Sequence, residues 1–293
     1  MIYRNKCFQL FMHLVVLFLA LACIIPFLLL FSSSITSESS LTVNGYSLIP
    51  GEISLAAYDF LWTTKDSILR AYGMSFLITA TGTAVNLILT FLFAYPLSRK
   101  DLPGRRFISF FLFFTMLFNG GFVSTYLIYS NVFHINDTLA AMIVPYLLMN
   151  AFYVIMVRTY IMSNVPDEVL EAARIDGSNE FQNLIRIVIP MSRPILATVA
   201  LMSAIGYWNN WTNGVYFITT RTDLYGIQNF LNSVMNNVTA LSSHSTGLSN
   251  AQQFPSVSIR MALAVIAVIP VLIAYPFFQK SFVKGITIGS VKG

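Results

Sequence analysis

The sequence predicts an all-α integral membrane protein with six transmembrane helices and with both termini in the cytoplasm. Of its 293 residues, 56% are hydrophobic and only 10% are charged, whereas soluble domains carry roughly a quarter charged residues. Six apolar runs are each long enough to cross the ~30 Å hydrocarbon core of a bilayer. Because no linker divides these runs, residues 1–293 are expected to form a single transmembrane domain.

The apolar runs are separated by two long outer segments and one long inner loop. The first run is free of charge and follows Arg4 and Lys6. A cleaved signal peptide is the alternative for it, but the apolar core of such a peptide spans about 7–15 residues. The spans are expected at approximately 8–31, 72–97, 107–130, 139–160, 194–217 and 261–282. Outer loops are expected at 32–70 and 218–260, and a cytoplasmic loop at 161–193.

The basic residues fix the orientation of these spans. Cytoplasmic loops of membrane proteins carry an excess of Lys and Arg. With the N-terminus inside, the outer basic residues are Lys65, Arg70, Arg221 and Arg260. The inner ones are Arg4, Lys6, Arg99, Lys100, Arg105, Arg106, Arg158, Arg174, Arg186, Arg193, Lys280, Lys284 and Lys292. Topology therefore explains the net charge of +5 better than binding to nucleic acid does.

The loop at 161–193 is the most polar interior stretch, and it predicts two short helices joined by a turn. Asn164 is expected to cap the first helix, with Pro166 in its first turn. Gly177 permits a left-handed backbone conformation that strains other residues. Ser178 is expected to cap the second helix.

One string in this loop resembles the EAA signature of the permease subunits of binding-protein-dependent ABC importers. It reads Glu171-Ala172-Ala173-Arg174-Ile175-Asp176-Gly177 and continues through Phe181 to Pro190. The resemblance implies a coupling helix that docks into a cleft on a separate ATPase subunit. It assigns this contact to Glu171, Ala172, Ala173, Asp176, Gly177 and Phe181. Glu171 is an acid in a basic loop, so we expect it to meet a basic partner on the ATPase. An ordinary spacer loop is the alternative.

Other stretches resemble the carbohydrate-importer branch of this family and cover nearly the whole chain. They are Gly45-Tyr46-Ser47-Leu48-Ile49-Pro50 with Tyr58, Phe118-Asn119-Gly120-Gly121-Phe122, Tyr207-Trp208-Asn209-Asn210-Trp211, and Phe282-Val283-Lys284-Gly285-Ile286-Thr287. The resemblance implies import of a carbohydrate of the complex-oligosaccharide type. Asn119 and Thr212-Asn213-Gly214 depart from the family pattern, so no particular sugar is carried over.

The polar groups expected at membrane depth are neutral. Amides donate and accept hydrogen bonds, and aromatic faces pack on the apolar faces of sugar rings, so this set suits a hydroxyl-rich ligand. The candidate pathway residues are Asn119, Asn150, Trp208, Asn209, Asn210, Trp211 and Asn213. Two alternatives stay open, namely hydrogen bonds that hold the helices together and an aromatic belt at the outer interface.

The sequence lacks the motifs of a self-sufficient transporter or an enzyme. It has no Gly-x-x-x-x-Gly-Lys-Ser/Thr phosphate loop, so ATP and Mg²⁺ are expected on the partner ATPase and no cofactor or metal on this chain. The spans contain almost no ionisable residues, which disfavours a secondary transporter. His13, His134 and His244 are scattered and indicate no metal site. An ABC importer of a non-sugar solute is the alternative function.

The resemblance also implies partners and a location. A second homologous permease subunit, a pair of ATPase subunits and an extracellular sugar-binding protein are expected around this chain in the cell membrane. The other expected partners are the oligosaccharide and membrane lipid, without nucleic acid. The short basic tail, with Lys284, Gly285 and Lys292, is expected to touch the ATPase pair.

Overall fold

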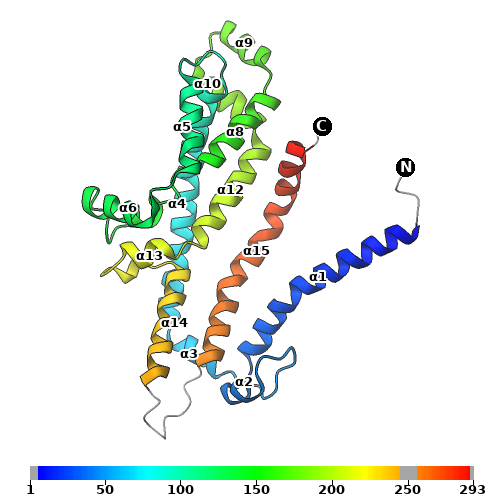
Figure 1. The fold of residues 1–293 in the computed structure, drawn as a ribbon, viewed down its shortest axis with the longest axis vertical. Helices are drawn as coiled ribbons and strands as arrows, with labels where there is room; N and C mark the ends of the chain where they lie inside the picture. The colour runs from blue at the N-terminus through cyan, green and yellow to red at the C-terminus, as the bar shows by residue number, and fades with distance from the viewer. Residues whose placement is uncertain (1–5, 245–255, 291–293) are drawn as a thin grey trace. The chain divides into compact units, whose positions relative to one another are not determined.

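The computed structural model describes residues 6–244 and 256–290, and these ranges are mainly helical (Figure 1). Within them no strand forms, and Thr36 and Ile53 make an isolated β-bridge. The all-α class is therefore confirmed. The α-helices are α1 (Lys6–Ser34), α2 (Glu38–Asn44), α3 (Ala56–Thr63), α4 (Lys65–Ser98), α5 (Arg105–Leu117), α6 (Gly121–Leu127), α7 (Leu139–Ile143), α8 (Ala151–Asn164), α9 (Asp167–Ile175), α10 (Glu180–Asn183), α11 (Ile189–Met191), α12 (Arg193–Trp208), α13 (Thr212–Phe217), α14 (Ile227–His244) and α15 (Ser256–Ser290). Two π-helical segments, η1 (Ile128–Val132) and η2 (Leu184–Val188), and a 3₁₀ turn, η3 (Thr222–Leu224), complete the set.

The chain divides into two compact units, each described by itself. The first comprises 1–68 and 231–272. Within it, the carboxylate of Glu38 accepts hydrogen bonds of 2.9–3.1 Å from the backbone N–H groups of Val257 and Ser258 in the first turn of α15. The second unit comprises 69–230 and 273–293, and it holds both candidate functional regions.

Two helices are long and apolar enough to cross a membrane by themselves, residues Phe8–Ser34 of α1 and the whole of α4. Two further pairs qualify if each counts as one bent span. These are α5 with Gly121–Val132, bent by 112°, and Glu180–Met191 with α12, bent by 84°. The described residues thus contain two such helices or up to four, and the six-span arrangement stays a prediction.

Two expected spans, 107–130 and 194–217, are each interrupted in the structure and do not form single straight helices. Gly121 opens α6 with a φ of +81°, a left-handed conformation that a straight helix does not contain. Residues 209–211 separate α12 from α13, because amide side chains compete with the helical backbone for hydrogen bonds. An apolar run predicts burial in lipid, but it does not require one straight helix.

The expected span 139–160 has the longest interruption. Helix α7 ends at Ile143 and α8 begins at Ala151. Tyr146, in the gap, has a φ of +66°. By contrast, the span expected at 72–97 lies inside the longer helix α4, and the span at 261–282 lies inside α15.

Hydrogen bonds from three other helices reach the last two residues of α7 and the interrupted backbone that follows, residues 142–150 together, which we call the broken segment. Within hydrocarbon, a carbonyl outside a helix needs a donor from the protein because water is absent. The donors belong to α4, α12 and α13. The bonds run from Asn86 Nδ2 to Leu147 O (2.8 Å) and Leu148 O (3.2 Å), from Tyr207 Oη to Ile143 O (3.1 Å), and from Asn213 Nδ2 to Met142 O (3.4 Å) and Pro145 O (3.1 Å).

A close approach between α4 and α12 lets these donors reach the broken segment. A Cβ atom on Gly82 would lie 2.5 Å from the ring of Tyr207, nearer than packed carbon atoms come. Asn86 lies one turn further along α4, on the same face as Gly82, and is fully buried. Apolar side chains pack around this contact, namely Ile78, Ala141, Met142, Phe217, Ile218 and Leu224.

Asp137 ties the segment before α7 to the segment after α13. Its carboxylate accepts hydrogen bonds from the backbone N–H groups of Thr219, Thr220 and Arg221 (2.8–3.0 Å) and from the Thr219 hydroxyl (2.7 Å). Because these bonds favour the charged form, the pKa of the Asp137 carboxyl lies well below its usual value. This contact holds α13, and with it Asn213, beside the broken segment.

Replacing Asn86 with leucine should destabilise the protein, because the carbonyls of Leu147 and Leu148 lose their donor while the side chain keeps its size. We expect the free energy of unfolding to fall by about 1–2 kcal/mol. Thermal unfolding of the purified protein in detergent measures the change. Asn209→Leu is the matched control, since the Asn209 side chain is exposed. Equal melting temperatures for Asn86→Leu and the wild type would contradict this role.

Replacing Asp137 with asparagine should lower the melting temperature at neutral pH and matter less in acid. A carboxyl whose pKa is lowered by folding stabilises the folded state fully above its unfolded pKa, about 3.9. That stabilisation is lost as the pH falls below this value. The difference in melting temperature between wild type and variant should therefore shrink below about pH 4. A difference that does not change with pH would show that the carboxylate charge is not its source.

Candidate functional site

A groove of about 460 Å³ lies beside the broken segment, and we call it the amide–aromatic groove. Helices α6 and α13, the turn between α12 and α13, and the broken segment all contribute to its walls. Every lining residue is neutral. The side chains that give the groove its chemistry are Asn119, Phe122, Tyr146, Asn210, Thr212 and Asn213.

Aromatic rings form one wall of this groove. The rings of Phe122 and Tyr146 lie 6.0 Å apart with only 12° between their planes. The ring of Phe122 also contacts that of Tyr216, at a centroid distance of 4.0 Å. Tyr146 is 41% exposed, so its ring is available to a ligand. Rings arranged in this way offer flat apolar faces beside hydrogen-bonding amides.

Three predicted pathway residues line the groove, and each also has a structural role. The Asn119 side chain accepts a hydrogen bond from the N–H of Gly121 (2.9 Å). Asn210 accepts one from the N–H of Asn213 (3.2 Å). Asn213 is almost fully buried and donates to the broken segment. These bonds use the side-chain oxygens of Asn119 and Asn210 and do not involve their N–H₂ groups.

The other four predicted pathway residues do not line this groove. Asn150 caps α8, its side chain accepting from the N–H of Phe152 (2.9 Å). Trp208 is buried against Phe76, with ring centroids 5.2 Å apart. Asn209 and Trp211 are exposed.

Sequence reasoning did not select Phe122 or Tyr146 for the pathway. Phe122 follows Gly120 and Gly121. This glycine pair was the available signal that the helix is interrupted here and that an aromatic residue lies next to the interruption. Tyr146 lies in an apolar run that is typical of a membrane helix. Within such a helix, nothing distinguishes its ring from the other aromatic side chains. Its position depends on the φ of +66°, which no local pattern in the sequence indicates.

The loop between α8 and α12 forms the predicted helix–turn–helix. Gly177 has a φ of +85°, as expected for the turn, and the N–H of Ser178 donates to the carbonyl of Ala173 (2.9 Å), which closes α9 as a Schellman motif. The predicted caps were wrong by one or two residues. Asn164 ends α8, and Pro166 takes the N-cap position of α9. Asn179, rather than Ser178, caps α10 through a capping box with Gln182.

One side of helix α9 packs against the apolar core, and the opposite side is exposed. Leu170 is buried in the apolar cluster below it. Ile175 is 86% exposed, although the sequence prediction left it out of the contact surface. Glu171 and Ala172 are also exposed, and Glu171 has no ion pair with any described residue. This exposed face, with Glu171, Ala172 and Ile175, is called the α9 face below.

Charged side chains connect α9 and α10 to the end of α4, and we call them the ionic cluster. Arg174 pairs with Glu180 and with Asp101, the latter at 3.4 Å. Lys100 pairs with Asp167 at 2.9 Å, and this hydrogen bond keeps the pKa of the Asp167 carboxyl below its usual value. The full set is Arg99, Lys100, Asp101, Asp167, Arg174 and Glu180.

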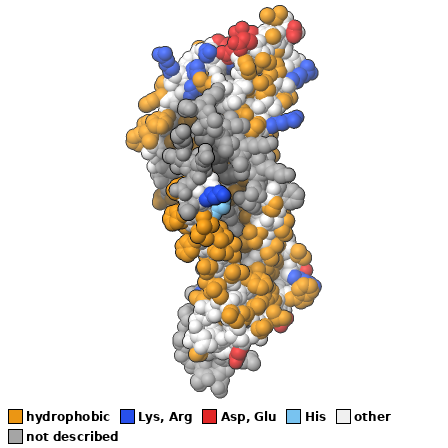
Figure 2. Space-filling view, turned by 90° about the vertical axis from the view of Figure 1, so that its right-hand side faces the viewer, with side chains coloured by type: hydrophobic (Ala, Val, Ile, Leu, Met, Phe, Trp, Pro, Cys, Tyr) orange, Lys and Arg blue, Asp and Glu red, His pale blue; other side chains and the backbone are white. Residues whose placement is uncertain are grey.

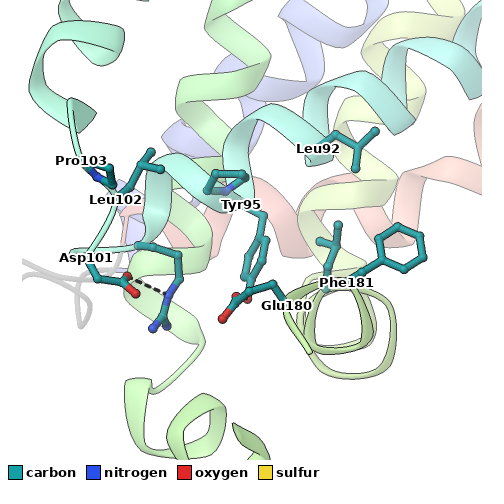
Figure 3. A pocket seen from close by; sticks show the side chains of 10 residues that line it. Leu92, Tyr95, Asp101, Leu102, Pro103, Glu180 and Phe181 are labelled. Carbon is teal, nitrogen blue, oxygen red and sulfur yellow. Dashed lines mark hydrogen bonds and ion pairs between the residues drawn. The ribbon is translucent and has the colours of Figure 1, made fainter. Parts of the chain in front are cut away.

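A second groove, of about 450 Å³, lies between the end of α4 and α10 (Figure 3). Tyr95 points from α4 toward α10, and its hydroxyl donates to the carboxylate of Glu180. Phe181, one of the predicted coupling residues, lines this groove and is 63% exposed. The ionic cluster and Tyr95 thus fix α9 and α10 to α4.

The predicted tail lies in or beyond the last turns of α15. The backbone of Lys284 and Gly285 is helical, and Lys292 lies outside the described residues. In the described ranges, His, Cys, Asp and Glu form no group of three or more that could hold a metal ion.

Comparison with known proteins identifies a family. Residues 86–288 match the family model described as "Binding-protein-dependent transport system inner membrane component". The "Polygalacturonan/rhamnogalacturonan transport system permease protein YtcP" of Bacillus subtilis is 34% identical over 99% of this chain and 100% of its own length. "Protein LplC" of the same species is 36% identical over 92% of this chain and 90% of its own.

A solved structure has the same fold over nearly the whole chain. It comes from a bacterial ABC transporter "involved in the import of the acidic polysaccharide alginate". The TM-score is 0.80 with 27% sequence identity, over 96% of this chain and 98% of the matching one.

Proposed function

This chain belongs to the family of binding-protein-dependent transport system inner membrane components, and we propose that it is the permease subunit of an ATP-driven importer of oligosaccharides. The chain is thus a membrane permease of the ABC importer type. Relatives named for polygalacturonan/rhamnogalacturonan, for arabinooligosaccharides and for alginate support the substrate class. No particular sugar is assigned.

The observation that carries the substrate class is the chemistry of the amide–aromatic groove. Its described lining residues are amide, hydroxyl, aromatic and apolar residues without charge. The ring faces of Phe122 and Tyr146 suit the apolar faces of sugar rings, and the amides of Asn119 and Asn210 suit their hydroxyl groups. A broken helix beside the groove also fits a pathway, because irregular backbone at membrane depth occurs where it lines a cavity.

The remaining parts of the proposal concern the assembly. The chain crosses the membrane six times with its termini and the ionic cluster in the cytoplasm, which the distribution of basic residues supports. Basic side chains gather around the upper end of Figure 2, the end that carries α9 and α10. A second, homologous permease subunit completes the pathway, and an extracellular sugar-binding protein delivers the oligosaccharide. ATP and Mg²⁺ bind to a separate pair of ATPase subunits, which the tail around Lys284 contacts.

Coupling is proposed to run from the α9 face to the amide–aromatic groove through α4. An ATPase subunit binds the exposed Glu171, Ala172 and Ile175. The ionic cluster and Tyr95 transmit movement of α9 and α10 to the end of α4. Helix α4 is continuous from there to Asn86, a distance of about 20 Å along its axis, and Asn86 holds the carbonyls of the broken segment. One rigid helix therefore joins the two regions.

Replacing Tyr146 with alanine should weaken transport of the oligosaccharide by removing an aromatic wall of the groove. We expect the KM for uptake to rise roughly tenfold, equivalent to ~1.4 kcal/mol. Uptake of labelled oligosaccharide by cells measures this, with membrane insertion checked by immunoblotting. Asn209→Ala is the matched control, because Asn209 precedes the groove residue Asn210 in the sequence but does not line the groove. Unchanged uptake in Tyr146→Ala would rule the groove out as the pathway.

Replacing Ile175 with aspartate should detach the ATPase. Burying an isoleucine side chain at an interface contributes about 1.5–3 kcal/mol, so the ATPase should be retained at least tenfold less well by the purified permease. Val169→Asp is the matched control, since Val169 is exposed on the flank of α9 opposite Glu171. Glu171→Ala tests the charged contact on the same face. Equal ATPase retention by Ile175→Asp and Val169→Asp would contradict docking on the α9 face.

A further inference from the structure

The basic side chains near the end of α4 fall into two groups. Arg99, Lys100 and Arg174 each have a carboxylate partner within 4.0 Å in the ionic cluster. Arg105 and Arg158 have no carboxylate within this distance among the described residues, and neither does Arg106. The second group therefore carries positive charge that the described protein does not neutralise.

Two of these unneutralised arginines are held together by one carbonyl oxygen. The Nε of Arg105 and the Nε of Arg158 donate to the carbonyl of Leu97, at 2.9 and 3.0 Å. Leu97 is 2% exposed, so this anchor point is fixed inside the protein. Two guanidinium groups that share an acceptor repel each other. An anion bound between them would offset this repulsion.

The same arginines line a groove of about 860 Å³. Its basic residues are Lys100, Arg105, Arg106 and Arg158, and it has no acidic lining residue. Gly104 and Phe107 also line it, which places the N-terminus of α5 at its edge. Since α5 has no acidic residue in its first turn and no side-chain cap, its N-terminal N–H groups add to the positive potential. We call this site the arginine groove.

An apolar surface continues directly from the arginine groove along α5. Phe107 is 73% exposed, and Phe110 and Phe111 are more than half exposed. The groove lies where α4, a helix able to cross the membrane, ends and α5 begins. Positive charge at the end of the membrane helices, with exposed aromatic rings beyond it, matches a ligand that has an anionic head and hydrocarbon chains.

We propose that the arginine groove binds the phosphate headgroup of an anionic phospholipid, with the acyl chains lying along the aromatic face of α5. Planar guanidinium groups bind phosphate oxygens through paired N–H donors, and basic pockets between membrane helices suit anionic headgroups. The site goes beyond the import function, because it lies apart from the amide–aromatic groove and the α9 face. A soluble phosphate compound has the same anionic group as the lipid headgroup, so the test below compares the lipid with inorganic phosphate.

The test uses the full-length protein purified in detergent. Dioctanoyl-phosphatidylglycerol, dioctanoyl-phosphatidylcholine and inorganic phosphate are titrated separately, and binding is followed by the shift in melting temperature and by native mass spectrometry. The variants are Arg158→Gln, which loses the bond to Leu97, and Arg106→Gln. The Arg106 side chain makes no hydrogen bond or ion pair with any described residue, so this variant should fold normally. Arg186→Gln is the control, since Arg186 is exposed and lies outside the groove.

Phosphatidylglycerol should bind the wild type and Arg186→Gln equally, and each of the other two variants about tenfold more weakly, since each lacks one charge-assisted contact. Phosphatidylcholine should bind more weakly than phosphatidylglycerol to the wild type. If Arg106→Gln, Arg158→Gln and the wild type bind phosphatidylglycerol with equal affinity, the proposal that the arginine groove binds the headgroup is wrong. Inorganic phosphate that binds as tightly as phosphatidylglycerol would overturn the lipid assignment, because the acyl chains would then contribute nothing.

Discussion

The arrangement of the second unit depends on one constraint, the need to supply hydrogen-bond donors to the backbone of the broken segment. The α-helical hydrogen bonding is interrupted between the end of α7 and the start of α8, so carbonyls here accept from side chains of other helices. Asn86, Tyr207 and Asn213 supply these donors from three separate helices. The groove, its aromatic wall and the position of α13 all follow from that arrangement, because the same backbone carries Tyr146.

A second set of contacts gives α9 and α10 their position, and it is electrostatic. Arg174 bridges acids on two separate segments, Asp101 after α4 and Glu180 at the start of α10. Exposed ion pairs contribute little individually, but this cluster joins a tyrosine hydroxyl and several charges in one network. The consequence is that α9 turns Glu171, which has no ion pair within the described part of the chain, and the exposed Ile175 away from the protein, where a separate subunit can reach them.

Local signals in the sequence predicted local structure well. The helical class followed from composition, and the turn at Gly177 followed from the freedom of glycine to adopt a positive φ. The breaks in three apolar spans were missed, because hydrophobicity indicates a lipid environment without indicating how the backbone runs through it. For Asn213, the sequence left open whether the side chain lines the pathway or hydrogen-bonds to another helix. Its acceptors, the carbonyls of Met142 and Pro145, are about seventy positions away in the chain. Tyr146 and Ile175 were not among the predicted site residues for the same reason, because the exposure of their side chains depends on tertiary structure.

The close approach at Gly82 limits how this sequence can change over evolutionary time. Any side chain at this position would meet the ring of Tyr207 and push its hydroxyl away from the carbonyl of Ile143. Position 82 therefore tolerates no replacement unless position 207 changes as well, and that second change would remove a donor to the broken segment. Val85 and Ile88, exposed on the same helix, accept any apolar residue that suits lipid. Helix α4 thus combines positions that can change freely with one, Gly82, that can change only together with Tyr207 of α12.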